Sequence, residues 1–407
     1  RARKGETDIM IGARSALFTP FPNLGLIILD EEHEGAYKSE TTPRYHAREV
    51  AEKLAKLNEA AFVMGSATPS VEAYAKAQAG IYRLFTLKKR AKAGSELAAV
   101  EIADLRKEME AGNKSIFSLR LQELIKDRLA KKEQVMLFIN RRGYSSFVSC
   151  RSCGEALKCP HCDVSLTLHN HQRLVCHYCG YQIPMPKKCP HCGSPYLAGF
   201  GIGTQKIEEM AAQMFPEAKL LRMDLDTTSK KGGHEKILSA FAKGKADILI
   251  GTQMIVKGHD FPGVTLVGVL AADVSLYAPD YTAAERTFQL LVQAAGRAGR
   301  GRKAGIALIQ TYMPEHYSIQ TATSQDYESF FKQEMGYRRL MQYPPACHML
   351  SMQVAGENEE LMTRIMEAIA ASVRKHFEEQ TQIIGPVPAP VYKVNDIYRK
   401  ILYIKNE

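Results

Sequence analysis

The sequence predicts an α/β protein with two parallel-sheet regions, a zinc-binding insert in the second region and a small α+β unit at the end. Short apolar runs alternate with helical stretches in residues 1–90 and again from about residue 115. Eight of the nine cysteines lie between positions 150 and 192. We therefore expect five segments, with bounds 1–90, 91–147 (a linker and the start of the second region), 148–196, 197–315 and 316–407.

Composition and charge favour an anionic partner. The chain is 45% hydrophobic and 24% charged, which provides apolar material for several buried cores. Its net charge of +10 and pI near 9.0 suggest nucleic acid as that partner. No apolar run reaches the length of a membrane span. Clustered CxxC pairs without a secretory segment indicate a reducing cytoplasm.

The first region contains an apolar strand that ends in acids. LGLIILDEEH (24–33) places Asp30 and Glu31 at the carboxyl end of this strand, between the expected strands DIMIG and AAFVMGSA. In P-loop motors the first acid at such a position holds Mg²⁺, and the second activates the attacking water. An ordinary capped strand end is the alternative interpretation.

A hydroxyl-rich turn follows in FVMGSATPS (62–70). Because such a turn can reorganise its hydrogen bonds, we expect Ser66 and Thr68 to couple the nucleotide state to DNA contact. A turn that caps a helix beginning at Pro69 is compatible with the same residues. Upstream, Tyr37, Arg44 and Tyr45 lie in an aromatic and basic stretch that is suited to stacking on bases and holding phosphate. A surface loop with scattered aromatics is the alternative there.

The second region has a helix pattern, LRLQELIKDRLAKK, and strand patterns at QVMLFIN, AKLLRMD, ADILIGT and VTLVGVLAA. One loop between strands is expected to contact both nucleotide and DNA. Its candidates for the DNA backbone are Thr252 and Lys257, and its candidates for the nucleotide are Gly258 and Asp260.

A third motif, QLLVQAAGRAGRG (289–301), places Gln293, Arg297 and Arg300 at i, i+4 and i+7. Residues with this spacing share one helix face. Arginines so presented can stabilise the charge that develops on a transferred phosphate. The alternative is a solvated basic helix face.

The eight clustered cysteines form four CxxC pairs, which suit two tetrahedral zinc ions with no open coordination position. Disulfides or a redox role fit poorly, since the chain is long and lacks a signal peptide. A β-hairpin pattern between the second and third pairs favours one site of Cys159, Cys162, Cys176 and Cys179. The outer pairs, Cys150, Cys153, Cys189 and Cys192, would then form the other site. Two further divisions of the pairs are possible, and the nearby histidines are poor ligand candidates.

The last segment predicts an amphipathic helix between strands HMLSMQVAG and YRKILYIK. Apolar residues recur every four positions in it, and the strands should cover them. These residues are Leu361, Ile365, Ile369, Val373 and Phe377.

In their order, these motifs resemble the PriA family of primosomal replication-restart helicases, in superfamily 2, across nearly the whole chain. The resemblance is carried by GARSALFTPF (12–21), DEEH, GSATPS, INRRGYS (139–145), the eight-cysteine insert and QAAGRAGR. It implies two RecA-like P-loop lobes, the first one partial, and an ATP-dependent 3′→5′ DNA helicase. Such a helicase recognises stalled or abandoned forks and initiates primosome assembly.

The resemblance also implies ATP with Mg²⁺, two structural Zn²⁺, a C-terminal DNA-binding domain at 316–407 and a DNA contact at Arg14. Its implied partners are forked and single-stranded DNA, single-stranded-DNA-binding protein and primosome or helicase-loading proteins. We further expect a monomer that is associated with the nucleoid at replication forks.

The chain contains no GxxxxGK[ST] phosphate-binding loop. In the family this loop lies upstream of DEEH, so we expect a fragment that binds ATP poorly and hydrolyses little. Two hypotheses compete with the motor: a non-enzymatic, zinc-containing DNA-binding assembly scaffold, and a superfamily-2 motor that acts on RNA or in DNA restriction. A Glu31→Gln substitution separates motor from scaffold, because only a motor needs that carboxylate.

Overall fold

The computed structural model describes the chain except residues 40, 88–97, 114, 140–146, 163, 170–172, 200–202, 229–231, 257–260, 279, 300–302, 378–380 and 407. The chain divides into two compact units, Arg1–Thr86 and Leu87–Glu407. The segment KKRAKAGSEL (88–97), which the sequence indicates as a linker, lies outside the described residues.

The first unit is built on a two-stranded parallel sheet, β1 (Leu26–Asp30) and β2 (Ala61–Gly65). Helix α1 (Ala47–Leu57) covers one face, where Ile27 and Leu29 pack against Ala51 and Ala55. The other face is open, because Leu26, Ile28 and Val63 are exposed. Helix α2 (Val71–Gln78) follows β2, and three short 3-10 helices complete the unit: η1 (Ala2–Lys4), η2 (Arg14–Phe18) and η3 (Gly35–Tyr37).

The prediction of a strand at DIMIG is wrong in this structure. Residues 8–12 adopt no strand, and Ile9, Met10 and Ile11 are exposed. A strand is stabilised by backbone pairing with a neighbour, and β1 pairs with β2 in the sheet that the structure describes. An apolar run that pairs with nothing remains irregular.

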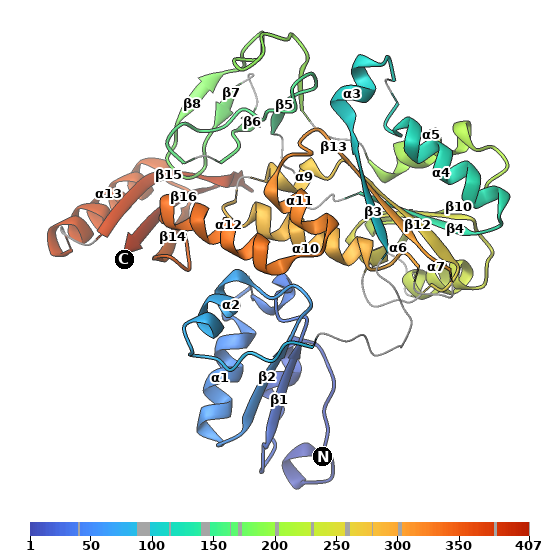
Figure 1. Cartoon of the computed structure of the whole chain (residues 1–407). Coiled ribbons are helices and arrows are strands. Elements are labelled where there is room, and N and C mark those ends of the chain that lie inside the picture. Colours follow the sequence, from blue (N-terminus) through green and yellow to red (C-terminus); the bar gives the residue numbers. More distant parts are fainter. Residues whose placement is uncertain are drawn as a thin grey trace. The chain divides into compact units, whose positions relative to one another are not determined.

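The second unit contains a six-stranded, all-parallel sheet in the order β10-β11-β4-β12-β13-β3. Strands β3, β4, β10, β12 and β13 of this sheet are labelled in Figure 1. Its strands are β3 (Ala99–Asp104), β4 (Gln134–Ile139), β10 (Leu220–Met223), β11 (Ile248–Gly251), β12 (Val264–Leu270) and β13 (Ile306–Thr311). The interior strands β11 and β12 are buried along their full length, as expected for a parallel sheet covered on both faces.

Helices on both sides bury this sheet. Helices α4 (Leu119–Ala130) and α5 (Thr204–Met214) contribute Leu121, Ile125 and Ile207 to the main core. Helix α10 (Ala283–Ala295) packs on β12 and β13 and contacts α11 and α12. The other helices that precede the C-terminal sheet in this unit are α3 (Leu105–Glu110), α6 (Leu225–Thr228), α7 (Gly233–Ala242), α8 (Gln253–Val256), α9 (Asp273–Leu276), α11 (Tyr317–Thr323) and α12 (Tyr327–Leu340).

The cysteine-rich insert consists of short antiparallel strands. One pair joins β5 (Val148–Cys150) to β9 (Leu197–Gly199). A three-stranded sheet contains β6 (Thr167–His169), β7 (Arg173–Val175) and β8 (Gln182–Pro184). The predicted hairpin between the second and third CxxC pairs is therefore present as β6 and β7.

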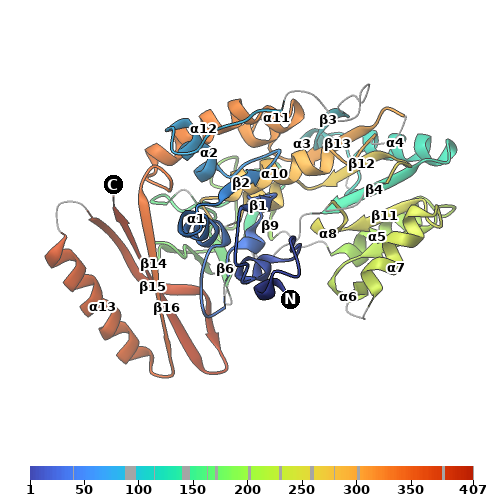
Figure 2. The same cartoon turned by 90° about the horizontal axis from the view of Figure 1, so that it is seen from below.

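The C-terminal part is an antiparallel sheet, β14 (His348–Gly356), β16 (Ile397–Asn406) and β15 (Thr381–Val394), with helix α13 (Glu359–His376) along one face (Figure 2). The helix and strands match the prediction, and Ile369 of the predicted stripe packs against the sheet. The two ends of the stripe are not buried. Leu361, Ile365 and Phe377 are 54%, 41% and 59% exposed.

The helix face that meets the sheet lies one residue further along the chain. It is formed by Met362, Met366 and Ala370, of which Met366 and Ala370 pack with Leu402 of β16. Flexible methionines and a small alanine fill the shallow space over a twisted sheet well. Leu361 and Ile365 then lie beside the contact, because a shift of one residue turns a helix by about 100°.

Candidate functional site

The two acids at the end of β1 are exposed, and the backbone turns sharply between them and the next residue. Glu31 has a φ of 48°, in the left-handed region, and its N–H donates to Asp30 Oδ1 at 3.0 Å. The chain then returns toward β2, where the Glu32 N–H donates to Gly65 O at 3.1 Å. This turn directs Asp30 and Glu31 to the surface and Glu32 into the interior.

Glu32 belongs to a buried ion pair that holds the first unit together. It is 3% exposed, and its Oε2 accepts from Arg48 Nη1 at 3.1 Å. Arg48 also donates to Ser70 Oγ at 2.9 Å and to Glu72 Oε2 at 2.6 Å, so α1, α2 and the strand end are joined. Burial alone would lower the pKa of Arg48, but Glu72 and Glu32 outweigh it and raise that pKa.

Replacing Arg48 by methionine should destabilise the first unit by roughly 3–5 kcal/mol, because Glu32 would keep a buried charge without its partner. Thermal unfolding combined with hydrogen exchange of β1 and α1 measures this loss. Lys56→Met on the same helix is the matched control, since Lys56 pairs with Glu52 on the surface and is 71% exposed. The control substitution should lower the free energy of unfolding of the first unit by at most about 1 kcal/mol. Equal losses in both variants would contradict the assignment.

A histidine links the acids to the hydroxyl-rich turn. His33 Nδ1 lies 2.7 Å from Ser66 Oγ, and Ser66 Oγ also accepts from the Thr68 N–H at 3.0 Å. Glu31 Oε2 is 3.6 Å from the same His33 nitrogen. Sequence reasoning placed Ser66 and Thr68 in one element but did not single out His33, whose only signal was the fourth place in DEEH. Thr68 is 2% exposed, so its side chain belongs to the interior in this structure.

The aromatic stretch folds against the acids and is ordered by Arg14. Tyr37 Oη donates to Asp30 O at 2.8 Å, and burial followed by the charge of Asp30 raises the pKa of Tyr37. Arg14 donates to the carbonyls of Ala36 and Lys38 and lies 5.5 Å from the centre of the Tyr45 ring. Arg44 is exposed. Arg14 therefore holds the loop of Ala36, Lys38 and Tyr45 in its conformation.

The prediction that Gln293, Arg297 and Arg300 share one helix face is wrong as stated. Helix α10 ends at Ala295, so only Gln293 lies within it. Arg297 lies in the turn that follows the helix, and its N–H donates to Ala294 O at 3.0 Å, a hydrogen bond to the residue three positions earlier. Gly299 ends this turn with a φ of 70°. The glycine at 296 favours this early end, since glycine is a weak helix former. Arg300 lies outside the described residues.

The loop predicted to contact nucleotide and DNA is described only at its start. Thr252 follows β11, and its carbonyl accepts from the Ile255 N–H at 3.0 Å as α8 begins. Lys257, Gly258 and Asp260 lie outside the described residues. So does most of INRRGYS, since residues 140–146 are not described.

Among the described residues, two groups of cysteines could hold a metal ion. Within each group all Sγ atoms lie within 4.8 Å of one another. The members of the outer cluster are Cys150, Cys153, Cys189 and Cys192, and those of the inner cluster are Cys159, Cys162, Cys176 and Cys179. This is the grouping that the hairpin pattern favoured among three possible divisions.

The chemistry of each cluster fits structural zinc. Four thiolates complete a tetrahedral shell and leave no position for a catalytic water. In the inner cluster, the hydrogen bond from the Cys162 thiol lowers the pKa of Cys176, which favours the thiolate form that binds zinc. The two four-cysteine clusters fit two zinc ions.

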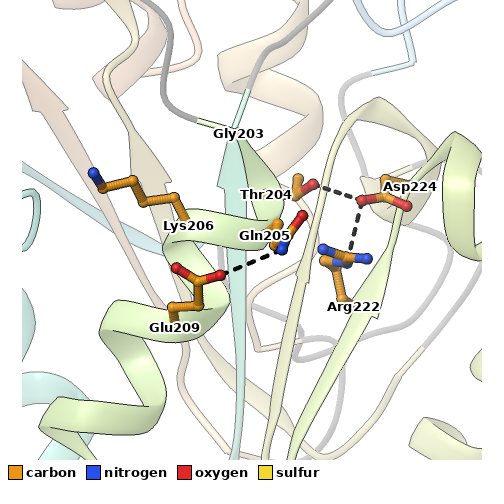
Figure 3. Close-up of a pocket in the computed structure, with 7 residues that line it drawn as sticks. All are labelled: Gly203, Thr204, Gln205, Lys206, Glu209, Arg222 and Asp224. Carbon is orange, nitrogen blue, oxygen red and sulfur yellow. Dashed lines mark hydrogen bonds and ion pairs between the residues drawn. The ribbon is translucent and has the colours of Figure 1, made fainter.

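A pocket of about 260 Å³, which sequence reasoning did not single out, lies at the start of α5 (Figure 3). Two of its lining side chains interact with Asp224: Thr204 Oγ1 donates to Asp224 Oδ2 at 2.6 Å, and Arg222 Nε lies 3.3 Å from the same oxygen. Because cations and anions are mixed in its lining, the pocket favours no particular ligand.

Comparisons with known proteins define the class first. Residues 202–302 match the family described as the helicase conserved C-terminal domain. Residues 159–184 match the PriA DNA helicase Cys-rich region domain, and residues 339–407 match the primosomal protein N C-terminal domain. The six-stranded sheet and the two cysteine clusters are thus those of a helicase-type α/β protein with a zinc-binding insert.

Curated relatives identify the family. The replication restart protein PriA of Bacillus subtilis (strain 168) is 50% identical over 406 residues, which cover 100% of this chain and 50% of that protein. Its namesakes from Synechocystis sp. and Haemophilus influenzae are 46% and 40% identical over 98% and 100% of this chain, and 49% and 55% of their own lengths. The chain belongs to the PriA family. It spans about half the length of these relatives.

Among the described residues, no helix is both long enough and apolar enough to cross a membrane.

Proposed function

We propose that this chain is part of an ATP-dependent 3′→5′ DNA helicase that recognises stalled or abandoned replication forks and initiates primosome assembly. The main support for the proposal is that the four residues of DEEH have different surroundings. Asp30 and Glu31 face outward at the end of β1, while Glu32 is buried against Arg48 and His33 contacts Ser66. This arrangement leaves two carboxylates for chemistry and connects them to a second element through one hydrogen bond.

In this proposal Asp30 would hold Mg²⁺ and Glu31 would activate the attacking water, with Mg²⁺ neutralising charge on the ATP phosphates. Gly258, Asp260, Gln293, Arg297 and Arg300 are the further residues proposed to contact the nucleotide. The residues proposed to contact DNA are Arg14, Tyr37, Arg44, Tyr45, Ser66, Thr252 and Lys257. Thr68, whose side chain is buried in this structure, remains a proposed DNA-contact residue together with Ser66.

The hydrogen bond between His33 and Ser66 suggests how hydrolysis is coupled to DNA contact. When Glu31 changes its interactions during hydrolysis, His33 is close enough to change with it, at 3.6 Å. Ser66 then gains or loses its hydrogen bond to His33, and the turn around Ser66 can change its contact with DNA. The functional coupling of Ser66 is therefore proposed to run through His33.

The name of the relatives, replication restart protein, supports a role in restarting replication. Forked and single-stranded DNA are the proposed substrates, and a bacterial cytoplasm, at replication forks, is the proposed setting. Single-stranded-DNA-binding protein and primosome or helicase-loading proteins are the proposed partners, and a monomer is the proposed active form. Residues 148–196 are proposed as the insert and 316–407 as a DNA-binding domain. The 407-residue chain alone is proposed to hydrolyse little ATP, because it contains no GxxxxGK[ST] loop.

The test is ATP hydrolysis by the full-length protein, with and without forked DNA. Strong stimulation by the fork is the expected result, and unwinding of a partial duplex with a 3′ tail but not a 5′ tail would establish the polarity. Absence of hydrolysis with every DNA would refute the motor.

A further inference from the structure

The two cysteine clusters are attached to different parts of the second unit. Around the outer cluster, Tyr277 Oη donates to Gly154 O, next to the ligand Cys153. Tyr277 lies directly after α9, and its ring is 4.7 Å from that of Phe147. Gly154, with a φ of 81°, approaches the strand end so closely that any side chain would collide with Tyr312 O. The outer cluster thus rests on the helicase sheet.

The inner cluster rests on the C-terminal part instead. Tyr343 Oη donates to the carbonyl of the ligand Cys162 at 3.2 Å, and Tyr343 is 2% exposed. The ring of Tyr178, between two ligands, is 4.9 Å from that of Tyr403 in β16. A side chain at Gly180 would come within 2.9 Å of Val387 in β15.

Tyr343 also contacts two further parts of the unit. Lys405 Nζ, from β16, lies 4.1 Å from the centre of its ring. The ring of Tyr281, just before α10, stacks on Tyr343 at 4.9 Å with an interplanar angle of 10°. Arg338 lies 5.3 Å over Tyr281 and forms a buried ion pair of 2.6 Å with Glu285 of α10. Tyr343 is therefore the residue at which the inner cluster, the C-terminal sheet and the base of α10 meet.

We propose that the two zinc sites have separate tasks: the outer site fastens the insert to the helicase sheet, and the inner site fastens the C-terminal sheet to the insert and to α10. Each attachment includes one buried tyrosine hydroxyl that donates to a backbone carbonyl of a cysteine turn. Tyr277 serves the outer site and Tyr343 serves the inner one. Both act as positioning residues, since neither is a ligand.

The attachments should slow the opening of each site independently. A cysteine turn must move away from its neighbours before its thiolates are released, and that movement breaks the tyrosine hydrogen bond. Loss of one such bond should therefore speed opening by roughly two- to tenfold, as expected for a hydrogen bond in a folded protein. The effect should stay at the cluster whose carbonyl lost its donor.

The matched variants are Tyr277→Phe and Tyr343→Phe, which keep each ring and remove only its hydroxyl. The zinc-loaded chain is incubated with a chelator and N-ethylmaleimide, and mass spectrometry follows the alkylation of each cysteine with time. Tyr277→Phe should speed alkylation at Cys150, Cys153, Cys189 and Cys192 alone. Tyr343→Phe should speed it at Cys159, Cys162, Cys176 and Cys179 alone. Tyr196→Phe, at a side chain that is 63% exposed beside the outer cluster, should change neither.

Hydrogen exchange provides a second readout that does not depend on thiol chemistry. Tyr343→Phe should raise exchange in β14 and β16, and Tyr277→Phe should leave those strands unchanged. The proposal is overturned if either variant opens both clusters alike, or if neither variant changes any alkylation rate. Unchanged exchange in the C-terminal strands of Tyr343→Phe would refute the inner attachment.

Discussion

Replacing Glu31 by glutamine in the full-length protein is expected to lower DNA-stimulated ATP hydrolysis at least about 100-fold, the contribution typical of a general base. Binding of forked DNA should stay within about twofold, because Glu31 is exposed and outside the buried ion pair of the first unit. Steady-state hydrolysis and fluorescence anisotropy with a labelled fork measure the two properties. The substitution keeps the size of the side chain, so folding should be unaffected.

The matched control is Glu49→Gln, which removes an exposed carboxylate in the first turn of α1. This variant should hydrolyse ATP at the normal rate. Full unwinding activity in Glu31→Gln would reject Glu31 as the residue that activates water. Loss of DNA binding and hydrolysis together would point to a structural role instead.

Replacing Cys159 by serine should release one of the two zinc equivalents and unfold the small sheet β6–β8. Structural zinc binding in small peptides contributes about 10–16 kcal/mol, far more than a ribbon of three short strands supplies by burial. Leu166 and Leu174 are fully buried in one core with Cys159, Cys162 and Cys176, so we expect this core to open when the inner zinc is lost. Zinc content by atomic emission and hydrogen exchange of β6–β8 measure the change.

Cys347→Ser controls for the loss of a thiol as such. Cys347 lies in neither cluster, and its Sγ donates to Gln342 O at 2.9 Å, a bond that a serine hydroxyl can also make. Both zinc ions should remain in this variant. Release of both ions from Cys159→Ser would show that the two sites are not independent.

Patterns along the chain predicted those parts of the structure that are determined by residues close together in the sequence. The strand of DEEH and the grouping of the cysteines follow from spacing along the chain. So does the capped helix at GSATPS, although it begins at Val71 with Ser70 as its N-cap and not at Pro69. The prediction that the sheet covers Leu361 and Ile365 was wrong. Spacing by four residues identifies an apolar helix face, but it does not identify which edge of that face a twisted sheet will contact.

The contacts that organise the candidate site join distant residues and have no local signature. Arg48 reaches Glu32 across 16 positions, and His33 reaches Ser66 across 33. Tyr343 meets Cys162 across 181 positions. Each of these side chains is ordinary in its own segment, and only the fold gives it a partner.

The buried Glu32 changes how genetic variants of the DEEH tetrad should be interpreted. The two adjacent glutamates have opposite surroundings, one in solvent and one 3% exposed against Arg48. Alleles at Glu32 would resemble catalytic defects in a complementation assay although they act through folding, and growth at low temperature would partly restore them. Alleles at Glu31 would stay null at every temperature. Substitutions within the DEEH tetrad should therefore fall into two classes, temperature-dependent at Glu32 and null at all temperatures at Glu31.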